Sequence, residues 1–560
     1  METTDKASCN ELAALLVSHG VRRAVVSPGS RNAPLYTALK ARGDIDVTVI
    51  VDERCAGFYA LGQSVQGGEP VVVVCTSGTA LLNLAPATAE AYYRCVPLIV
   101  VSADRPAEWI DQDDSQTLRQ YEALSPYVKG SYDIPAVDTP SMRWMTNRLI
   151  NDAMLTATSG RQGPVHINVQ LDVPLGGKSE CHEDGVRVIG RIVPEERLST
   201  AEARLIGRNI FSPVKVMIVT GFMPPDNRLN TALRKLASKP NIVVLTETVS
   251  NLHGEKFIGS IDSTLCRIDG NRIGEYVPDV VITAGGALVS RFIKKFLREN
   301  PPREHWHVGH TLTTVDCFKS LTSRIDMSPA IFFRQLASAV QPDRGESGYA
   351  SMWHALKDSA RRSHEAYVDS APWSDMKVFG VLSRSLPVEW NIHYSNGTPI
   401  RYSQLFPSRF HRVDCNRGVS GIDGCTSTAL GASSCYRGTT LLVTGDMSAQ
   451  YDIGALMSVR LSGPFKMIVM MNGGGAIFRF VDSTSGMDCL DEFVSRPARL
   501  PLREICHGVG ARYFEAHSAD ELSSVLIDFI TEKDKAAVLA VYTDSAVSAM
   551  TLKNYFKNIK

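Results

Sequence analysis

The chain has 560 residues, of which 44% are hydrophobic and 21% charged, an ordinary composition for a globular protein of three or four domains. Its 59 Lys and Arg residues balance 59 Asp and Glu residues, so charge does not direct it to nucleic acid or an anionic membrane. No apolar run approaches the roughly 20 residues of a membrane span, and we expect no signal peptide. The 12 scattered cysteines, without a Cys-x-x-Cys pair, favour buried thiols, a cytoplasmic location and no zinc site.

Short apolar runs alternate with helical patterns along the whole chain, and most of them end at loops rich in Gly, Ser, Asp or Arg. The predicted strands are residues 24–26, 47–51, 71–74, 98–101, 165–169, 216–219, 242–245, 280–283, 441–443 and 467–471. Continuous apolar strands between helices are typical of parallel sheets covered on both faces. We predict an α/β protein with domains at 1–185, 186–345 and 346–560, joined by a polar linker over 175–198 and a charged segment at 341–346.

The most informative stretch covers residues 441–478. Its first apolar run stops at Thr444-Gly445-Asp446, a helical pattern follows up to Gly463-Pro464, and the second run stops at Asn472 before three glycines. A strand–helix–strand unit of this kind almost always makes the two strands parallel, so Asp446 and Asn472 should lie at the same carboxyl edge of a sheet.

The side chains at this edge suit a hard cation. Asp446 offers a carboxylate and Asn472 an amide oxygen, and the glycines let a carbonyl oxygen, that of Gly474, turn inward. Three oxygen ligands on one side favour Mg²⁺ or Mn²⁺ shared with a diphosphate. The competing interpretation is that Asp446 caps a helix and the glycines form a turn.

Three further groups of residues carry chemistry. Glu53 follows one predicted strand and precedes an apolar helix start; poor hydration there would raise its pKa and let it share a proton with a ligand, although a surface glutamate at a helix start is the simpler reading. Arg31, Arg105, Arg401 and Arg417 follow strands or turns and suggest carboxylate binding. Residues 416–424 form a glycine-rich anion cradle before a helix of small residues.

Together these motifs resemble one family. They are SPGSRNAP at 27–34, DER at 52–54, TSGTA at 76–80, DRP at 104–106, NRGVSGIDG at 416–424 and GDMS at 445–448. As a set they are similar to the 2-succinyl-5-enolpyruvyl-6-hydroxy-3-cyclohexene-1-carboxylate synthases, thiamine-diphosphate enzymes of menaquinone biosynthesis. The motifs cover the first and last thirds in order, and the middle third matches mainly by layout.

The resemblance implies three doubly wound parallel-sheet α/β domains of the thiamine-diphosphate-enzyme type. It implies a homodimer or homotetramer whose active site lies between chains, with Glu53 from one copy and the metal ligands from another. It also implies a reaction in which 2-oxoglutarate loses CO₂ and its four-carbon remainder is added to isochorismate.

The resemblance assigns roles to individual residues. Glu53 would hydrogen-bond the aminopyrimidine, and the metal ligands would be Asp446, Asn472 and Gly474. Other cofactor contacts would come from Ser420, Gly421, Ile422, Gly445, Ser448, Ile477 and Phe478. Isochorismate would be bound by Ser30, Arg31, Arg105, Gln116 and Arg291, and the oxoglutarate carboxylate by Arg401 and Arg417; Arg31, Arg401 and Arg417 are counted with Glu53 as catalytic.

Three residues depart from the family pattern: Gly397 stands for a serine, Met471 for an asparagine and Arg291 for a lysine. Three alternatives stay open at this point. One is another thiamine-diphosphate decarboxylase or carboligase, and one is a cofactor-binding protein without catalysis. The third is a nucleotide-binding module at Gly285-Gly286, which the missing GxGxxG pattern disfavours.

Overall fold

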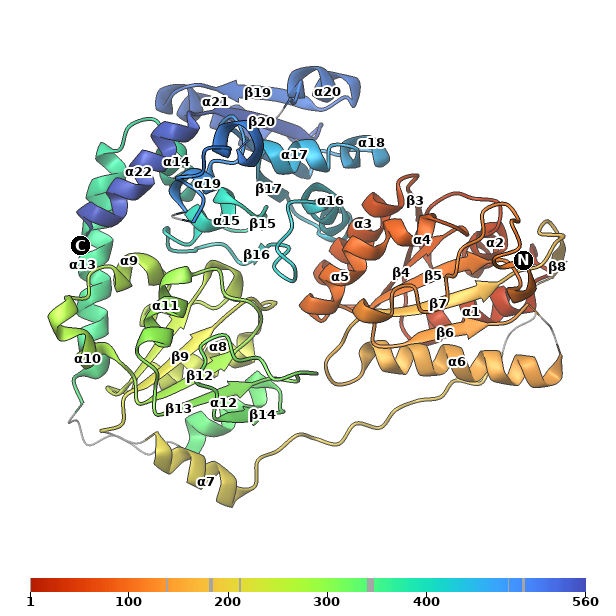
Figure 1. Ribbon diagram of the computed structural model, residues 1–560, viewed down its shortest axis with the longest axis horizontal. Coiled ribbons are helices and arrows are strands. Elements are labelled where there is room, and N and C mark those ends of the chain that lie inside the picture. The colour runs from red at the N-terminus through yellow and green to blue at the C-terminus, as the bar shows by residue number, and fades with distance from the viewer. Residues whose placement is uncertain are drawn as a thin grey trace. The chain divides into compact units, whose positions relative to one another are not determined.

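The computed structural model describes residues 2–136, 139–180, 185–210, 213–339, 347–481, 483–495 and 499–559. Three six-stranded sheets and one two-stranded pair make up its β-structure (Figure 1). The chain divides into two compact units. The first comprises the chain up to Val193 with Asn416–Thr440 and Tyr451–Phe465, and the second comprises Pro194–Cys415, Leu441–Gln450 and the chain from Lys466 onward.

The sheet of the first unit has the order β3-β2-β4-β5-β7-β6. Its strands are β2 (Arg23–Val26), β3 (Asp46–Val49), β4 (Val71–Cys75), β5 (Leu98–Asp104), β6 (Ser131–Ile134) and β7 (Val165–Gln170). Val72 and Val74 pack with helices α1 (Ala7–Ser18), α2 (Ala33–Arg42) and α6 (Pro140–Thr158) on one face. On the other face lie α3 (Glu53–Gly67), α4 (Ala80–Asn83) and α5 (Ala85–Arg94). The strand β1 (Glu2–Thr4) pairs antiparallel with β8 (Lys178–Glu180).

The central sheet, in the second unit, has the order β11-β10-β9-β12-β13-β14. Its strands are β9 (Val216–Thr220), β10 (Ile242–Thr246), β11 (Phe257–Ile258), β12 (Val280–Ala284), β13 (Glu304–Val308) and β14 (Ser323–Ile325). Alternate residues of β9 pack into two different hydrophobic cores. Val216 and Ile218 pack with α8 (Asn227–Leu236) and α12 (Pro329–Ala339). Met217 and Val219 pack with α9 (Ile261–Leu265) and α11 (Arg291–Glu299). The two-residue period of a strand therefore feeds both faces of the sheet.

The third sheet has the order β16-β15-β17-β18-β20-β19. Its strands are β15 (Asn391–Tyr394), β16 (Arg412–Asp414), β17 (Thr440–Gly445), β18 (Phe465–Met471), β19 (Arg512–Ala516) and β20 (Ala537–Tyr542). The remaining helices are α7 (Thr200–Asn209), α10 (Ile273–Tyr276), α13 (Tyr349–Ser370), α14 (Asp375–Ser385), α15 (Thr398–Ser403), α16 (Cys425–Cys435), α17 (Asp446–Tyr451), α18 (Ala455–Ser458), α19 (Ile477–Phe480), α20 (Leu502–Gly508), α21 (Ala519–Thr531) and α22 (Ser545–Asn558). Short 3₁₀ turns lie at Ala107–Trp109, Ser125–Tyr127, Thr248–Ser250 and Gly270–Arg272, and a π-helical turn at Leu490–Val494.

Within the second unit the central and third sheets are joined by directional bonds. The amide of Asn251 donates to the Val413 carbonyl oxygen (2.9 Å) and accepts from the Val413 N–H (2.7 Å). The Thr248 N–H donates to the side-chain oxygen of Gln404 (3.0 Å). These contacts connect the turn after β10 with β16 and with the segment after α15, so the two sheets form one packed body.

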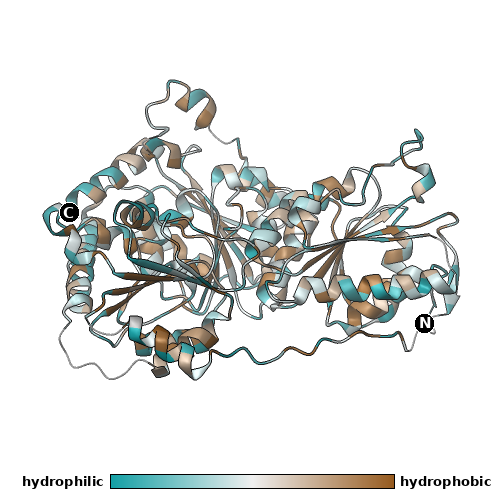
Figure 2. Cartoon of the chain, turned by 60° about the horizontal axis from the view of Figure 1, so that its bottom comes forward, coloured by the Kyte–Doolittle hydropathy of each residue, from teal (hydrophilic) through white to brown (hydrophobic). Residues whose placement is uncertain are grey.

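The predicted fold class is confirmed. Every strand pair with a described register in the three large sheets is parallel, and the strands are mostly hydrophobic (Figure 2). The predicted helix after Gly445 is instead two short helices, α17 and α18, because Asp452 between them turns into a buried hydrogen-bonding position. In the described residues, every helix is too short or too polar to cross a bilayer. The predicted segment 341–346 and the boundary within it lie outside the described residues.

Helices α3 and α16, both in the first unit, pack backbone against backbone. A Cβ atom added at Gly431 of α16 would lie 2.0 Å from the Tyr59 carbonyl oxygen. A Cβ at Gly62 of α3 would lie 2.0 Å from the Thr428 carbonyl oxygen. A side chain at either position would collide with main chain, so the glycines set the distance between the helices.

We expect Gly431→Ala to lower the free energy of unfolding of the first unit by about 1–3 kcal/mol, since overpacking against main chain forces a backbone shift. Urea denaturation followed by far-ultraviolet circular dichroism measures the loss. Gly67→Ala, on the same helix as Gly62, is the control: its Cβ would meet only the flexible end of Arg23, and it should cost nothing. Equal stability of the Gly431 variant and the wild type would contradict the close packing.

Candidate functional site

The structure brings Asp446 onto the glycine turn that follows β18. Strands β17 and β18 are neighbours in the sheet, and Asp446 begins α17 directly after β17. One carboxylate oxygen, Oδ2, accepts from the N–H groups of Gly473 and Gly474, each at 2.9 Å. The other, Oδ1, accepts from the Met447 N–H at 2.8 Å. The two strand tips therefore meet as the strand–helix–strand pattern predicts.

Asn472 is oriented by a second carboxylate that the sequence did not single out. Its amide nitrogen donates to Oδ2 of Asp375 at 3.0 Å, which leaves the amide oxygen directed away from Asp375. Asp375 also accepts from the hydroxyls of Thr543 (2.6 Å) and Ser548 (3.2 Å). The Gly474 carbonyl oxygen accepts from the Ser495 hydroxyl at 3.0 Å and keeps a second lone pair.

The electrostatics of this edge favour a cation. Asp446 and Asp375 are 3% and 1% exposed, and burial raises the pKa of both carboxyls, that of Asp446 to about 6. Among the described residues, neither carboxylate forms an ion pair with a Lys, Arg or His. Two buried carboxylates without a positive partner are costly, and a bound divalent cation would offset that cost. The donor set, one carboxylate, one amide oxygen and one carbonyl oxygen, fits Mg²⁺.

Glu53 is the first residue of α3 and is half-buried. The helix start is capped by Asp52, whose carboxylate accepts from the Cys55 N–H at 3.1 Å. Glu53 belongs to the first unit, whereas Asp446, Asn472 and Gly474 belong to the second.

The predicted anion cradle, residues 416–424, lies in the first unit and is held by a buried glutamate. Both carboxylate oxygens of Glu90 on α5 are used, accepting from the Gly418 N–H at 2.8 Å and the Val419 N–H at 2.7 Å. Arg94, one turn later, donates to the side-chain oxygen of Asn416 at 3.0 Å. Ser420 adopts a left-handed φ of 68°. The side chains of Ser420 and Ile422 stay partly exposed on this anchored loop.

Ser30, Arg31, Arg105 and Gln116 gather at the carboxyl edge of the first sheet. Arg31 is buried and donates to the Leu171 carbonyl oxygen at 2.8 Å. Burial, followed by the nearby charge of Arg105, lowers the pKa of Arg31. Arg105 pairs with Asp114 at 2.9 Å, and Gln116, with a φ of 57°, lies against Gly78. Two of these four side chains are therefore cations held close together.

A buried network of polar side chains holds the turn after β4 and the end of β5, which form part of this edge. Gln120 accepts from the Gly78 N–H at 2.7 Å and donates to the Ala103 carbonyl oxygen and the Asn168 side chain. Asn168 in turn donates to Asp104 at 2.9 Å. The network fixes the turn after β4 relative to the end of β5, where Arg105 follows. A single sequence shows no signal for it, because polar residues on strand ends are usually exposed.

The remaining predicted residues are spread over both units. Arg401 lies on α15 and contributes positive charge near the buried carboxyl of Asp262. The residue before α15, Gly397, has a φ of 99°, a conformation that a serine would rarely adopt. Arg291 is exposed at the start of α11, and Arg417 lies on the anchored loop of the first unit. Gly445, Ser448, Ile477 and Phe478 lie in the second unit, on β17, α17 and α19.

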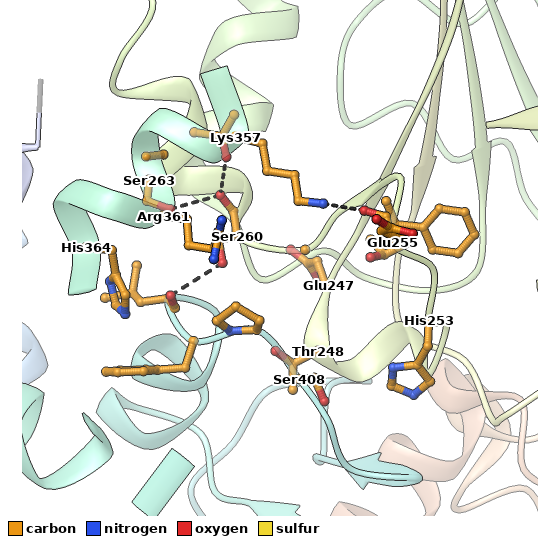
Figure 3. Close-up of a pocket in the computed structure, with 18 of the residues that line it drawn as sticks. Glu247, Thr248, His253, Glu255, Ser260, Ser263, Lys357, Arg361, His364 and Ser408 are labelled. Atoms are coloured by element: carbon orange, nitrogen blue, oxygen red, sulfur yellow. Dashed lines mark hydrogen bonds between the residues drawn. The ribbon is translucent and has the colours of Figure 1, made fainter. Parts of the chain in front are cut away.

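A cavity of about 730 Å³ lies elsewhere in the second unit, between the loop after β10, helix α13 and the segment after α15 (Figure 3). Its lining carries charges of both signs, and Lys357 donates to the Glu255 carbonyl oxygen across one end. None of the residues predicted for the site lines this cavity. It is separate from the predicted cofactor and substrate residues.

Comparison with known proteins supplies the family. Residues 9–123 match the family model "Thiamine pyrophosphate enzyme, N-terminal TPP binding domain". A 2-succinyl-5-enolpyruvyl-6-hydroxy-3-cyclohexene-1-carboxylate synthase of Porphyromonas gingivalis is 39% identical over 99% of this chain and 98% of its own length. Proteins of the same name from Phocaeicola vulgatus and Flavobacterium psychrophilum are 36% and 35% identical, over 100% and 96% of this chain and 99% and 96% of their own lengths. The chain therefore belongs to the 2-succinyl-5-enolpyruvyl-6-hydroxy-3-cyclohexene-1-carboxylate synthase family.

Proposed function

We propose that this chain decarboxylates 2-oxoglutarate with thiamine diphosphate and joins the four-carbon remainder to isochorismate. The product would be 2-succinyl-5-enolpyruvyl-6-hydroxy-3-cyclohexene-1-carboxylate, a precursor of menaquinone. The full-length similarity to synthases of that name supports the reaction. The observation that carries the proposal is the buried Asp446, joined to the Gly473–Gly474 turn and left without a positive partner among the described residues.

Asp446, Asn472 and the Gly474 carbonyl would hold Mg²⁺ or Mn²⁺, and the metal would hold the diphosphate. Ser420, Gly421, Ile422, Gly445, Ser448, Ile477 and Phe478 would contact the rest of the cofactor. Bound thiamine diphosphate supplies an electron sink for the carbanion that loss of CO₂ leaves behind. The protein contributes binding, orientation and the exclusion of water around that chemistry.

Glu53 would hold a proton against the ring nitrogen of the aminopyrimidine. Its place at the capped start of α3 limits the movement of its backbone, and its partial burial limits competition from water. A carboxyl group in this setting can share a proton with a ligand nitrogen and adjust the basicity of the amino group on the same ring.

The arginines supply positive charge for substrates that are all carboxylates. Arg31 and Arg105, with Ser30, Gln116 and Arg291, would bind the two carboxylates of isochorismate. Arg401 and Arg417 would bind the remote carboxylate of 2-oxoglutarate. Arg31 is anchored on Leu171, so its guanidinium is already ordered and less rotamer entropy is lost on binding.

We also infer a homodimer or homotetramer in which Glu53 of one copy completes the metal site of another. Val51, Tyr451 and Met457 of the first unit are 75%, 55% and 69% exposed, and a second copy would cover apolar side chains of this kind. The predicted cytoplasmic location stays a prediction.

The reaction is tested with purified protein, thiamine diphosphate and Mg²⁺. We expect CO₂ release from 2-oxoglutarate and the loss of isochorismate to proceed together in equal amounts. The measurements are a coupled CO₂ assay and chromatography of isochorismate. Release of free succinate semialdehyde at a rate that isochorismate leaves unchanged would favour the alternative, a simple 2-oxo-acid decarboxylase.

Glu53→Gln should leave the fold intact and lower the rate of carboligation by about 10²–10⁴-fold, the usual contribution of a positioned acid or base. The amide keeps the size of the side chain but cannot share a proton with the ring nitrogen. Far-ultraviolet circular dichroism checks the fold, and the isochorismate assay measures the rate. Turnover at the wild-type rate would remove Glu53 from the mechanism.

Mg²⁺ with thiamine diphosphate should raise the thermal midpoint of the wild type but not of Asp446→Ala, because ligand binding stabilises only a protein that holds the ligand. At a ligand concentration of one hundred times Kd the gain is about 2.7 kcal/mol. Differential scanning fluorimetry with and without EDTA measures the effect. Asp528→Ala, which removes an exposed carboxylate on α21, is the matched control and should keep the full shift. A normal shift in Asp446→Ala would place the metal elsewhere.

A further inference from the structure

A fully buried carboxylate, Asp452, lies between α17 and α18 in the first unit, outside the residues that the sequence predicted for the site. Four groups face it. The N–H and hydroxyl of Ser427 donate to it at 2.7 and 3.0 Å, and the Cys55 thiol lies 3.7 Å away. The guanidinium of Arg54 is 3.6 Å from the same carboxylate oxygen as Cys55.

Two of these partners, Arg54 and Cys55, follow Glu53 in the first turn of α3. Arg54 makes further contacts with the residue before Asp452: it donates to the Tyr451 carbonyl oxygen at 3.2 Å, and its guanidinium lies 5.0 Å from the centre of the Tyr451 ring. The first turn of α3 is therefore held at its start by the Asp52 cap and from a neighbouring segment by Tyr451 and Asp452.

The other partner, Ser427, lies in the first turn of α16, directly after the loop with Ser420, Gly421 and Ile422. Asp452 thus joins the beginnings of two helices, one carrying Glu53 and the other following the predicted cofactor loop. The glycine contacts at Gly62 and Gly431 set the spacing of these helices farther along. Close packing alone permits small slides and rotations, whereas the Ser427 hydrogen bonds on α16, together with the Cys55 thiol contact and the Arg54 ion pair on α3, tie both helix starts to one carboxylate.

The burial of Asp452 is costly, which argues against a role in packing alone. An apolar side chain of similar size would fill the same space without the desolvation penalty of a carboxylate. Burial raises the pKa of this carboxyl to about 6, in keeping with that penalty. What the carboxylate provides, and an apolar residue would not, is an acceptor for the Cys55 thiol and an opposite charge for the Arg54 guanidinium.

We propose that Asp452 is a positioning residue for Glu53, acting through the first turn of α3. The role given to Glu53 rests on the proposed function. The ordering of the first turn of α3 by Asp452 does not depend on that function. Without Asp452 the helix start would loosen and the Glu53 carboxyl would sample orientations that miss the cofactor. A misplacement of about 1 Å can cost about a hundredfold in rate.

The first experiment follows amide hydrogen exchange in the apoprotein. Asp452→Ala should speed exchange at the backbone amides of Cys55 and Ala56 by about tenfold or more, because the contacts that hold this turn are lost. Asp452→Asn, which keeps an acceptor for the Ser427 N–H, should show a smaller increase. Unchanged exchange in both variants would overturn the proposal before any activity is measured.

Asp226→Ala in the second unit is the matched control. Asp226 is also a carboxylate held by backbone amides at a helix start, since it accepts from the N–H groups of Arg228 and Leu229 at 2.8 and 2.9 Å. The thermal midpoint of this variant should fall, while exchange at the start of α3 and kcat should stay at the wild-type level. If it slowed the reaction as much as Asp452→Ala does, general destabilisation would explain both and the proposal would fall.

The second experiment separates positioning from binding. Asp452→Ala should lower kcat by about tenfold to a hundredfold and change the KM for 2-oxoglutarate by less than about threefold. A double-mutant cycle compares the Kd for thiamine diphosphate, measured by quenching of tryptophan fluorescence, among the two single variants and the double variant. Asp452→Ala should leave this Kd unchanged when it is added to Glu53→Gln. Additive effects would show that Asp452 acts independently of Glu53. If the wild-type protein showed no turnover, the proposed function would be rejected. The hydrogen-exchange result would still decide whether Asp452 orders the first turn of α3.

Discussion

The site depends on one costly arrangement, a carboxylate buried at the joined tips of β17 and β18. Asp446 is stabilised by three backbone N–H groups, yet it remains a negative charge in protein, next to the second buried carboxylate of Asp375. Such a pair is costly unless a carboxyl is protonated or a cation lies beside it, and the divalent metal that we propose for this site would offset that cost. The orientation of Asn472 by Asp375 and the positive φ angles of the three glycines would serve the same proposed site by letting oxygen atoms converge.

Buried carboxylates also hold the first unit together. Glu90 anchors the glycine-rich loop through two main-chain amides, and Asp452 joins the first turns of α3 and α16. In both cases the acceptor is a side chain, and the main-chain donors lie within the loop expected to contact ligand or directly after it. Loops carry ligand-binding groups but are intrinsically mobile, so a charged acceptor that uses their free N–H groups orders them before the ligand arrives. The Gln120 network does the same for the turn beside Arg105.

The residues proposed to bind substrate illustrate how the fold concentrates charge. Arg31 and Arg105 come from loops after different strands, yet each strand ends at the same edge of the first sheet. Arg31 is held by a carbonyl oxygen and Arg105 by Asp114, so both guanidinium groups keep defined positions without cancelling all the positive charge. The positive φ of Gly397 before α15 gives a physical reason for glycine at this position, because a side chain there would strain the chain.

The sequence by itself determined the parallel α/β class, most central strands and the meeting of Asp446 with the glycine turn. These follow from local rules: apolar runs form buried strands, and a crossover helix makes neighbouring strands parallel. It did not predict β15, whose buried Asn391 and His393 interrupt the apolar pattern, or the break between α17 and α18. Only the tertiary structure revealed Asp375, Glu90, Gln120 and Asp452. Glu90 contacts a residue 328 positions away and Asp452 one that is 397 positions away, and a polar residue shows its burial only when such distant segments pack around it.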